Sequence, residues 1–433
     1  MVQFPKIKAK QKRISTAQRV EAEKKVKRDE IASGELIPEV NIGMVGHVDH
    51  GKTTLTQMLT GKWTDTHSEE IKRGITIRLG YADAVFYYCE KCDIYGISKK
   101  CQSCFGDCVA KRAVSFIDAP GHETLMATVL SGTSLMDGAL LLIAANEKCP
   151  QPQTAEHLKA LDIVGIKNII IVQNKIDLVS EEEALQNYKE IKDFIKGTVA
   201  ENAPIIPVSA MHSVNIDALI KTIEETIPTP KRDLSVDPKF FIARSFDVNR
   251  PGTAITDLVG SVIGGSLVSG TLKIGDELEV RPGGQTGEKW LPLKTKIIDI
   301  VQAGRRKEAR PGGLVALQTD LDPALSRGDG LSGHIAGSPG KMPPTWDKIK
   351  FKAELFDHVI GAGGNQKVEP IRTNDVLMIT AAIAKTVGVV TTAHSNVCEM
   401  KLKIPICAEK KDRIAIFKQV GGRWHLIGSG VLM

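Results

Sequence analysis

The sequence predicts an α/β domain with a mostly parallel sheet and helices on both faces, followed by two β-barrel domains. In the first half of the chain, short apolar runs such as Ala113–Ile117 and Gly138–Ala144 alternate with helical patterns at 123–134, 154–164, 181–195 and 216–227. This alternation is typical of a parallel sheet covered on both faces. Pro228 and Pro230 then end the last helical pattern. Beyond them, short strands separated by glycine turns are typical of β-barrels.

The expected barrel strands fall into two groups, separated by the break Ser338–Pro344. The first barrel is expected from strands at 240–246, 258–262, 266–268, 272–274, 278–280, 294–301 and 314–317. The second is expected from strands at 350–356, 375–382, 387–391, 401–404 and 413–418. These breaks predict four parts: a basic arm at 1–34, a nucleotide-binding α/β domain at 35–232, and barrels at 233–342 and 343–433.

Composition excludes a membrane protein and favours a cytoplasmic one. The chain has 433 residues, of which 42% are hydrophobic and 25% are charged, as is ordinary for globular domains. Its longest apolar runs are too short to span a bilayer, and no secretory signal pattern is present. The net charge of +6 is concentrated in the arm at 1–34. That arm is expected either to contact a polyanion such as RNA or to be a solvated, partly helical tail.

The stretch Gly46–Thr53 fits the pattern G-x-x-x-x-G-K-[ST] of a P-loop. It follows the apolar run Val40–Val45 and precedes a helical pattern, which is the context in which the motif binds a polyphosphate. Backbone N–H groups of the loop cradle the phosphates, Lys52 contacts the β- and γ-phosphates, and Thr53 ligates Mg²⁺. The residues expected to bind nucleotide here are Asp49, His50, Gly51, Lys52, Thr53 and Thr54.

Two further motifs complete the phosphate end of the expected site. Asp118 and Gly121 lie in a D-x-x-G segment directly after a strand, where the aspartate can hold Mg²⁺ through water and the Gly121 N–H can bond a γ-phosphate. His122 follows and is expected to orient the attacking water, so Gly121 and His122 are the expected catalytic residues. Thr76 is a candidate second hydroxyl ligand of Mg²⁺, in a segment that closes over the nucleotide.

The base is predicted to be guanine. Asn174, Lys175 and Asp177 form an N-K-x-D motif after an apolar strand. The Asp177 carboxylate can accept both N1–H and the exocyclic amine of guanine, whereas adenine has no matching pair of donors. Ser209, Ala210 and Met211 follow the next strand and are expected to bond the guanine carbonyl through backbone N–H groups.

Five of the eight cysteines lie between Cys89 and Cys108. Two C-x₂-C pairs, Cys89 with Cys92 and Cys101 with Cys104, have the spacing of a closed, four-thiolate structural zinc site. Cys108 is a spare that can replace Cys104. The alternatives are unmetallated reduced cysteines or, with less support, a redox role.

The four nucleotide motifs, at 46–53, 73–77, 118–122 and 174–177, together resemble translational GTPases, and an α/β domain followed by two barrels resembles elongation factor Tu. More specific segments resemble the gamma subunit of translation initiation factor 2. They lie at 63–70, 89–104, 151–154, 200–207, 244–249 and 423–428. The resemblance covers about residues 38–433 and leaves the basic arm unexplained. Asp49 and Thr53 look more like the archaeal form than the eukaryotic one, and Ser429 replaces the tryptophan usual in the family.

The resemblance implies a GTPase that binds GTP or GDP with Mg²⁺ and carries methionylated initiator tRNA to the small ribosomal subunit. It also implies alpha and beta partner subunits. In the family pattern Thr53 and Thr76 ligate one Mg²⁺, Asp49 and Gly74 lie near a second cation, and His122 is the catalytic histidine.

Several other functions fit parts of the sequence. An elongation factor for all aminoacyl-tRNAs, or one specific for selenocysteine, would share the GTPase motifs but not the cysteine pairs or the segment at 200–207. A sulfate adenylyltransferase subunit would need a catalytic partner and would leave the cysteines without a role. A GTP-binding scaffold without useful turnover would show no hydrolysis when ribosomes are present.

Overall fold

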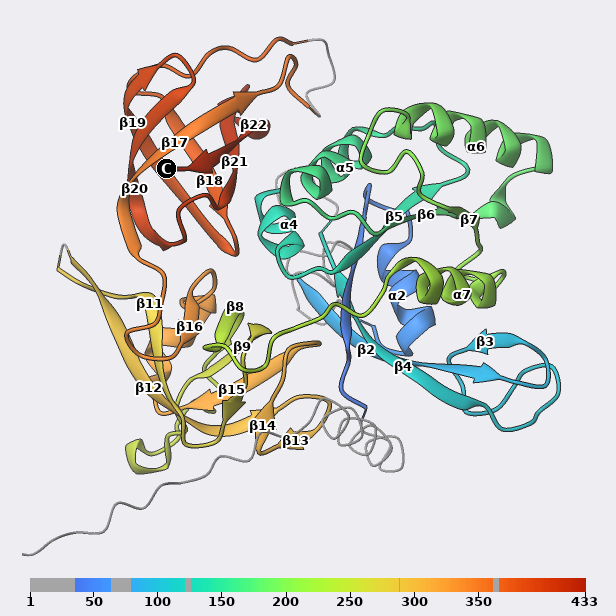
Figure 1. Ribbon diagram of the computed structural model, residues 1–433, viewed down its shortest axis with the longest axis horizontal. Helices are drawn as coiled ribbons and strands as arrows, with labels where there is room; N and C mark the ends of the chain where they lie inside the picture. Colours follow the sequence, from blue (N-terminus) through green and yellow to red (C-terminus); the bar gives the residue numbers. More distant parts are fainter. Residues whose placement is uncertain (1–35, 64–78, 121–125, 288, 361–365) are drawn as a thin grey trace, which may run out of the picture.

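The computed structural model describes residues 36–63, 79–120, 126–287, 289–360 and 366–433. Within them it contains an α/β region and two closed β-barrels (Figure 1), which confirms the predicted fold class. The basic arm at 1–34 lies outside the described residues. In the described part of the chain no helix combines the length and the apolar character needed to cross a membrane.

The α/β region is built on a seven-stranded sheet in the order β3-β2-β4-β1-β5-β6-β7. Neighbours from β4 to β7 pair in parallel, whereas β2 pairs antiparallel with both β4 and β3. The strands are β1 (Val40–Gly46), β2 (Gly80–Cys89), β3 (Ile94–Gly96), β4 (Val109–Asp118), β5 (Gly138–Ala144), β6 (Ile169–Asn174) and β7 (Ile205–Pro207).

Helices cover both faces of this sheet because alternate strand residues are apolar on each side. Helices α2 (Lys52–Thr60) and α7 (Ile216–Thr226) pack in one core, with Leu55 and Ile220 against the sheet. The other face is covered by α4 (Met126–Thr133), α5 (Pro152–Val164) and α6 (Glu181–Ile195). This arrangement brings the carboxyl ends of β1, β4, β6 and β7 to one edge, where ligands bind in such sheets.

The first barrel closes through the pairing of β11 with β12. Its six strands are β8 (Lys239–Phe246), β9 (Val262–Ser269), β11 (Glu277–Thr286), β12 (Lys289–Val301), β15 (Val315–Thr319) and β16 (Ile335–Gly337). The short strand β13 (Arg305–Arg306) pairs antiparallel with the end of β12, and β10 (Leu272–Lys273) pairs with β14 (Glu308–Ala309). Two 3₁₀ turns, η3 (Ile255–Asp257) and η4 (Pro323–Asp329), complete this region.

The second barrel has six strands in the closed order β17-β20-β19-β18-β21-β22. They are β17 (Thr345–Leu355), β18 (Val376–Ala381), β19 (Ala384–His394), β20 (Val397–Cys407), β21 (Arg413–Val420) and β22 (Arg423–Leu432). Inward residues such as Phe351, Ile379 and Ile416 fill its core.

The prediction of two separate strands between residues 258 and 268 was wrong. The segments 258–262 and 266–268 were predicted as separate strands, but residues 258–261 lie outside any strand and Val262–Ser269 form the single strand β9. Gly264 and Gly265 lie inside this strand, where a Cβ at Gly265 would be 1.8 Å from the Phe241 carbonyl oxygen. Close backbone approach, rather than a turn, therefore explains this glycine.

The α/β region packs against both barrels. Asn41 on β1 is buried at this junction, where its Oδ1 accepts from the Gly313 N–H at 2.8 Å and its Nδ2 donates to the Leu135 carbonyl oxygen at 3.0 Å. Arg413 on β21 donates to the Ile163 carbonyl oxygen, at the end of α5, at 3.1 Å. The two barrels thus hold the strand and the helix that flank the predicted nucleotide site.

Candidate functional site

The P-loop joins the end of β1 to the start of α2, as the motif predicted. Gly51 precedes the helix with φ of 88°, in the left-handed region. A Cβ at Gly51 would also lie 2.3 Å from Asn174 Nδ2. Both the backbone conformation and the close approach of Asn174 therefore require glycine at this position.

Lys52 and Thr53 lie at the start of α2 with their side chains engaged. Lys52 Nζ donates to the carbonyl oxygens of His47, at 2.6 Å, and Gly46, at 3.1 Å. Thr53 Oγ1 donates to Asp118 Oδ2 at 2.8 Å, and Asp118 is the buried last residue of β4. A hydroxyl beside a carboxylate offers the oxygen ligands that Mg²⁺ prefers, so this pair fits the expected ion.

The remaining predicted P-loop residues differ in exposure. Asp49 is exposed at the tip of the loop, with φ of 59°, and Thr54 is partly buried in the first turn of α2. The His50 ring instead turns into the protein, where its Nδ1 lies 2.9 Å from the Leu142 carbonyl oxygen. Burial lowers the pKa of His50 to about 4, so the ring is neutral at pH 7 and donates to Leu142. His50 can therefore contact a nucleotide only through the backbone of the histidine.

Asn174 connects the P-loop to the predicted guanine-binding loops. Its Nδ2 donates to the His50 carbonyl oxygen at 2.9 Å, and its Oδ1 accepts from the Ala210 N–H at 3.1 Å. Lys175 follows with φ of 62°. Three segments that are distant in the sequence therefore meet at one buried amide.

Asp177 lies in the 3₁₀ turn η2 (Ile176–Leu178), at the solvent edge of the site. Hydrogen bonding from the Ser209 side chain is the main cause that lowers the pKa of Asp177. His212 Nε2 lies 3.7 Å from Asp177 Oδ2. The carboxyl group is therefore ionised at pH 7, in the acceptor state that guanine recognition requires.

The loop after β7 differs from its expected role in one respect. The Ser209 N–H donates to the Val214 carbonyl oxygen at 3.3 Å, and the Ala210 N–H donates to Asn174. A guanine carbonyl would have to share these two N–H groups. Met211, the third residue of the predicted set, is 73% exposed.

Four predicted site residues lie outside the described residues. They are the expected catalytic pair, Gly121 and His122, and two expected cation-binding residues, Gly74 and Thr76. Their roles stay predictions. Of the D-x-x-G motif the structure describes Asp118, which ends β4 and bonds Thr53 of the P-loop.

One residue that the sequence argument missed is His157 on α5. It is 1% exposed, and its Nδ1 accepts a hydrogen bond from the Gly46 N–H at 2.7 Å. The available signal was a polar residue within the apolar pattern at 154–164. That signal alone does not reveal that the side chain reaches the P-loop.

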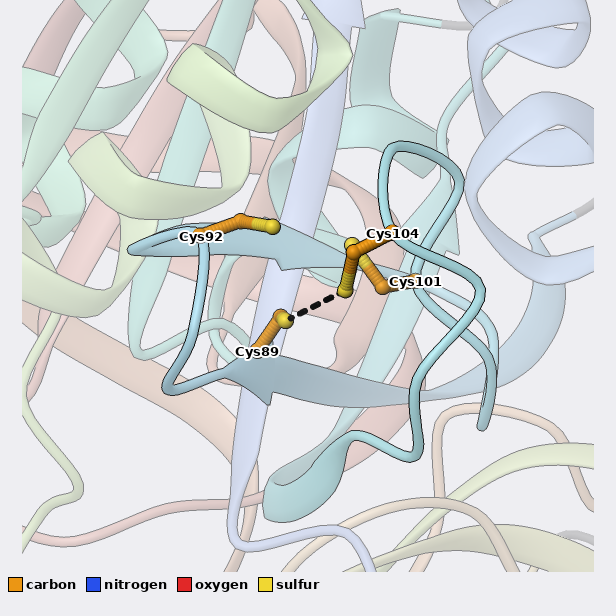
Figure 2. A group of neighbouring side chains, drawn as sticks. All are labelled: Cys89, Cys92, Cys101 and Cys104. Atoms are coloured by element: carbon orange, nitrogen blue, oxygen red, sulfur yellow. Dashed lines mark hydrogen bonds between the residues drawn. The ribbon is translucent and has the colours of Figure 1, made fainter.

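The four cysteines Cys89, Cys92, Cys101 and Cys104 converge as predicted. Figure 2 shows their thiol groups gathered from two segments, and all four sulfur atoms lie within 4.8 Å of one another. Cys89 Sγ and Cys104 Sγ are 3.6 Å apart. A tetrahedral site with Zn–S bonds of about 2.3 Å needs sulfur atoms about 3.8 Å apart, so the donor set fits Zn²⁺.

Cys108 is outside this group of four. Its backbone N–H donates to the Lys99 carbonyl oxygen at 2.8 Å. Within the cluster, backbone hydrogen bonds from Cys104 and Ser103 lower the pKa of Cys101 to about 6. A thiolate, the form that binds a metal, is therefore favoured at Cys101 near neutral pH.

The fold and the nucleotide motifs define a translational GTPase, and comparison with known families supports this class. The family model for the elongation factor Tu GTP binding domain matches residues 38–229, and that for initiation factor eIF2 gamma, C terminal, matches residues 347–432. The chain belongs to the translation initiation factor 2 subunit gamma family.

This family assignment rests on sequence similarity to gamma subunits over almost their full length. Translation initiation factor 2 subunit gamma of Methanococcus maripaludis strain C7 is 58% identical over 91% of this chain and 98% of its own length. The corresponding subunit of Methanocaldococcus jannaschii is 56% identical over 91% and 97%. That of Pyrococcus abyssi is 56% identical over the same shares.

Solved structures of elongation factors, one of them titled selenocysteine-specific, share the fold. A bacterial factor, EF-Sec, aligns with a TM-score of 0.69 and 24% identity over 91% of this chain, which spans 58% of that protein. The factor SelB of Methanococcus maripaludis, in complex with the GTP analogue GppNHp, aligns with a TM-score of 0.67 and 24% identity. The alignment covers 92% of this chain and 79% of the SelB chain. Identity this low supports the fold alone.

Proposed function

We propose that this chain is the GTP-binding core subunit of a heterotrimeric initiation factor that delivers methionylated initiator tRNA to the small ribosomal subunit. The observation that carries the proposal is similarity to gamma subunits over 91% of the chain, through both the GTPase region and the second barrel. Alpha and beta subunits are its proposed partners, and the cytoplasm is its proposed location.

In this proposal the nucleotide state controls tRNA binding. A bound Mg²⁺ would supply positive charge that offsets the charge of the phosphates. Thr53 and Asp118 hold the ion on the P-loop side, and Thr76 adds its hydroxyl when a γ-phosphate is present. Ordering of the segment around Thr76 then favours tRNA binding in the GTP state. His122 orients the attacking water, and hydrolysis releases the tRNA.

The remaining proposed ligands divide between the ion and the nucleotide. Asp49 and Gly74 lie near a second cation in this assignment, and Gly121 donates its N–H to the γ-phosphate. The nucleotide ligands comprise the P-loop and both loops at the guanine end, namely His50, Gly51, Lys52, Thr54, Asn174, Lys175, Asp177, Ser209, Ala210 and Met211.

Discrimination between tRNAs tests the proposal. Protection of the aminoacyl ester from hydrolysis is measured with the partner subunits, for methionylated initiator tRNA and for elongator aminoacyl-tRNAs, with a GTP analogue. The expected result is protection of the initiator alone. Equal protection of every aminoacyl-tRNA would assign the chain to the elongation factors, and protection of none would remove it from tRNA delivery.

GTP hydrolysis separates the proposal from a scaffold or a metabolic enzyme subunit. Hydrolysis is expected to be faster in the presence of small ribosomal subunits, because the family acts in translation. Absence of any ribosome-dependent hydrolysis would favour a scaffold.

We further propose that Cys89, Cys92, Cys101 and Cys104 hold one structural Zn²⁺. The insertion between β2 and β4 has few buried apolar residues, and a four-thiolate metal site supplies folding free energy that such a segment lacks. Elemental analysis of the purified protein is expected to give about one zinc per chain. A metal-free preparation with rapidly alkylated thiols would contradict the proposal.

A further inference from the structure

His157 contacts Gly46, the first residue of the P-loop. It lies on α5, more than a hundred positions along the chain from the loop, and its Nδ1 accepts from the Gly46 N–H at 2.7 Å. The histidine is buried, with 1% of its surface exposed. Because the two residues are far apart in the sequence, this buried hydrogen bond depends on the tertiary fold and not on a local turn.

Gly46 is held on both sides of its Cα. Its N–H donates to His157, and its carbonyl oxygen accepts from Lys52 Nζ at 3.1 Å. Gly46 has φ of 139°, a conformation that glycine adopts easily and also leaves easily. The hydrogen bond to His157 removes this freedom at the point where the chain leaves β1 and starts to surround the phosphates.

The helix that carries His157 is itself fixed. At its far end the Ile163 carbonyl oxygen accepts from Arg413 of the second barrel at 3.1 Å, and Lys159 Nζ lies 5.1 Å from the ring centre of Phe356. Rigid support of this kind is what a group needs if it is to hold another group in place.

A neutral ring is well suited to this position. The charged groups that face it include Lys52, with His47 and His50 also close. Burial lowers the pKa of His157 to about 3, so Nδ1 keeps its lone pair. A carboxylate would accept the same hydrogen bond but would bring a negative charge toward a polyphosphate. Imidazole accepts without that repulsion.

We propose that His157 is a positioning residue of the nucleotide site, which fixes the Gly46 peptide and thereby slows the release of bound nucleotide. The inference rests on the proposed assignment of residues 46–54 as phosphate ligands. It adds a residue on α5 to that site, one that touches the loop and not the nucleotide.

The experiment compares His157→Asn with His157→Leu. Asparagine Oδ1 takes nearly the same place as histidine Nδ1 and can accept from Gly46, whereas leucine fills space without an acceptor. Dissociation of a fluorescent GDP analogue is measured by stopped flow in the full chain with Mg²⁺. His157→Leu is expected to release GDP about tenfold faster, the effect of one buried hydrogen bond. His157→Asn is expected to stay within about threefold of the parent.

The outcomes separate positioning from packing. Equal rates for the two variants, whether fast or parent-like, would overturn the proposal, because the acceptor would then make no difference. The apparent melting temperature without nucleotide serves as the second readout, and a drop shared by both variants reports packing alone. If the leucine variant does not fold, His157→Gln replaces it. Its amide oxygen falls nearer the Nε2 position, so it is expected to release GDP faster than His157→Asn.

Failure of the underlying nucleotide assignment would look different. A parent protein that does not retain GDP, or a Lys52→Ala variant that retains it fully, would contradict the phosphate site itself. Retention of GDP by the parent with no difference between the asparagine and leucine variants would contradict only the role of His157.

Discussion

The two ends of the nucleotide site are built differently. At the phosphate end, backbone groups form the loop, and buried side chains hold it from beneath: His157 bonds Gly46, and His50 bonds Leu142. At the guanine end, the groups proposed to recognise the base are side chains and loop N–H groups near the solvent, with Asp177 in a 3₁₀ turn and Met211 exposed. Asn174 links the two ends through one amide.

This difference separates affinity from selectivity. Every nucleoside triphosphate presents the same phosphates, so a rigid backbone cradle binds them all. Only the base distinguishes GTP from ATP, and a few side chains read it. Changes at the guanine end should therefore exchange one base for another, whereas changes at the phosphate end should alter the retention of every nucleotide.

The largest expected effect is at Asp177. Asp177→Asn replaces one of the two acceptor oxygens with an NH₂ donor, which leaves one guanine donor facing another donor, and should weaken GTP binding by about 3 kcal/mol, roughly a hundredfold. Binding of xanthosine triphosphate should improve, because its additional carbonyl oxygen accepts from the new amide. Equilibrium titration with both nucleotides measures the exchange. GTP binding as tight as in the parent would remove Asp177 from base recognition.

A smaller effect, on the rate of GTP hydrolysis alone, is expected from substitution of His122. His122→Ala should slow GTP hydrolysis by about tenfold or more and leave nucleotide affinity nearly unchanged, because the residue is proposed to orient water and not the nucleotide. Single-turnover hydrolysis and GDP affinity are measured on the same preparation. Parallel loss of both would indicate that the histidine supports the structure instead.

The buried histidines predict how the phosphate end responds to acid. In the folded state burial lowers the pKa of His47, that of His50 to about 4 and that of His157 to about 3, all from an ordinary value of 6.5. The unfolded chain therefore binds protons first as the pH falls. Stability is complete above pH 6.5 and declines below it, by about 1.4 kcal/mol per pH unit for His50 down to about pH 4 and for His157 down to about pH 3. His47 contributes in the same direction.

The decline is measured by unfolding the protein in guanidinium at pH 7, 6 and 5. The protein carries a fluorescent GDP analogue, and release of the analogue monitors the unfolding. His157→Asn removes one titrating group and should give a shallower pH dependence than the parent. An unchanged dependence would mean that His157 does not remain neutral in the folded protein.

The smallest effect is expected at Cys108, far from both ends. Because its thiol lies outside the group of four, Cys108→Ser should keep about one zinc per chain. Cys104→Ser is the matched comparison and should lose the metal. Loss of zinc from the Cys108 variant would show that this cysteine is a ligand.

The sequence predicted elements best where local chemistry sets their ends. Helix α6 matches its expected span of 181–195 because Ser180 and Glu183 form a reciprocal capping box at its start. The four cysteines also met as expected, since paired C-x₂-C turns bring thiol groups together wherever the chain folds.

Expectations failed where long-range pairing decides the structure. Strands β16 and β22 were not anticipated, yet each is part of the ring of hydrogen bonds that closes its barrel. A three-residue strand such as Ile335–Gly337 carries too little periodicity to be recognised in sequence. His157 was missed for the same reason, because its significance depends on Gly46, which only the folded sheet brings close.

We propose that the nucleotide state of this site controls tRNA binding. The most direct measurement compares dissociation constants for methionylated initiator tRNA with the GTP analogue and with GDP, using the chain together with its alpha and beta subunits. Binding is expected to be tighter in the GTP state by about 5- to 150-fold, the usual range of such coupling. Equal dissociation constants in the two states would contradict the proposal.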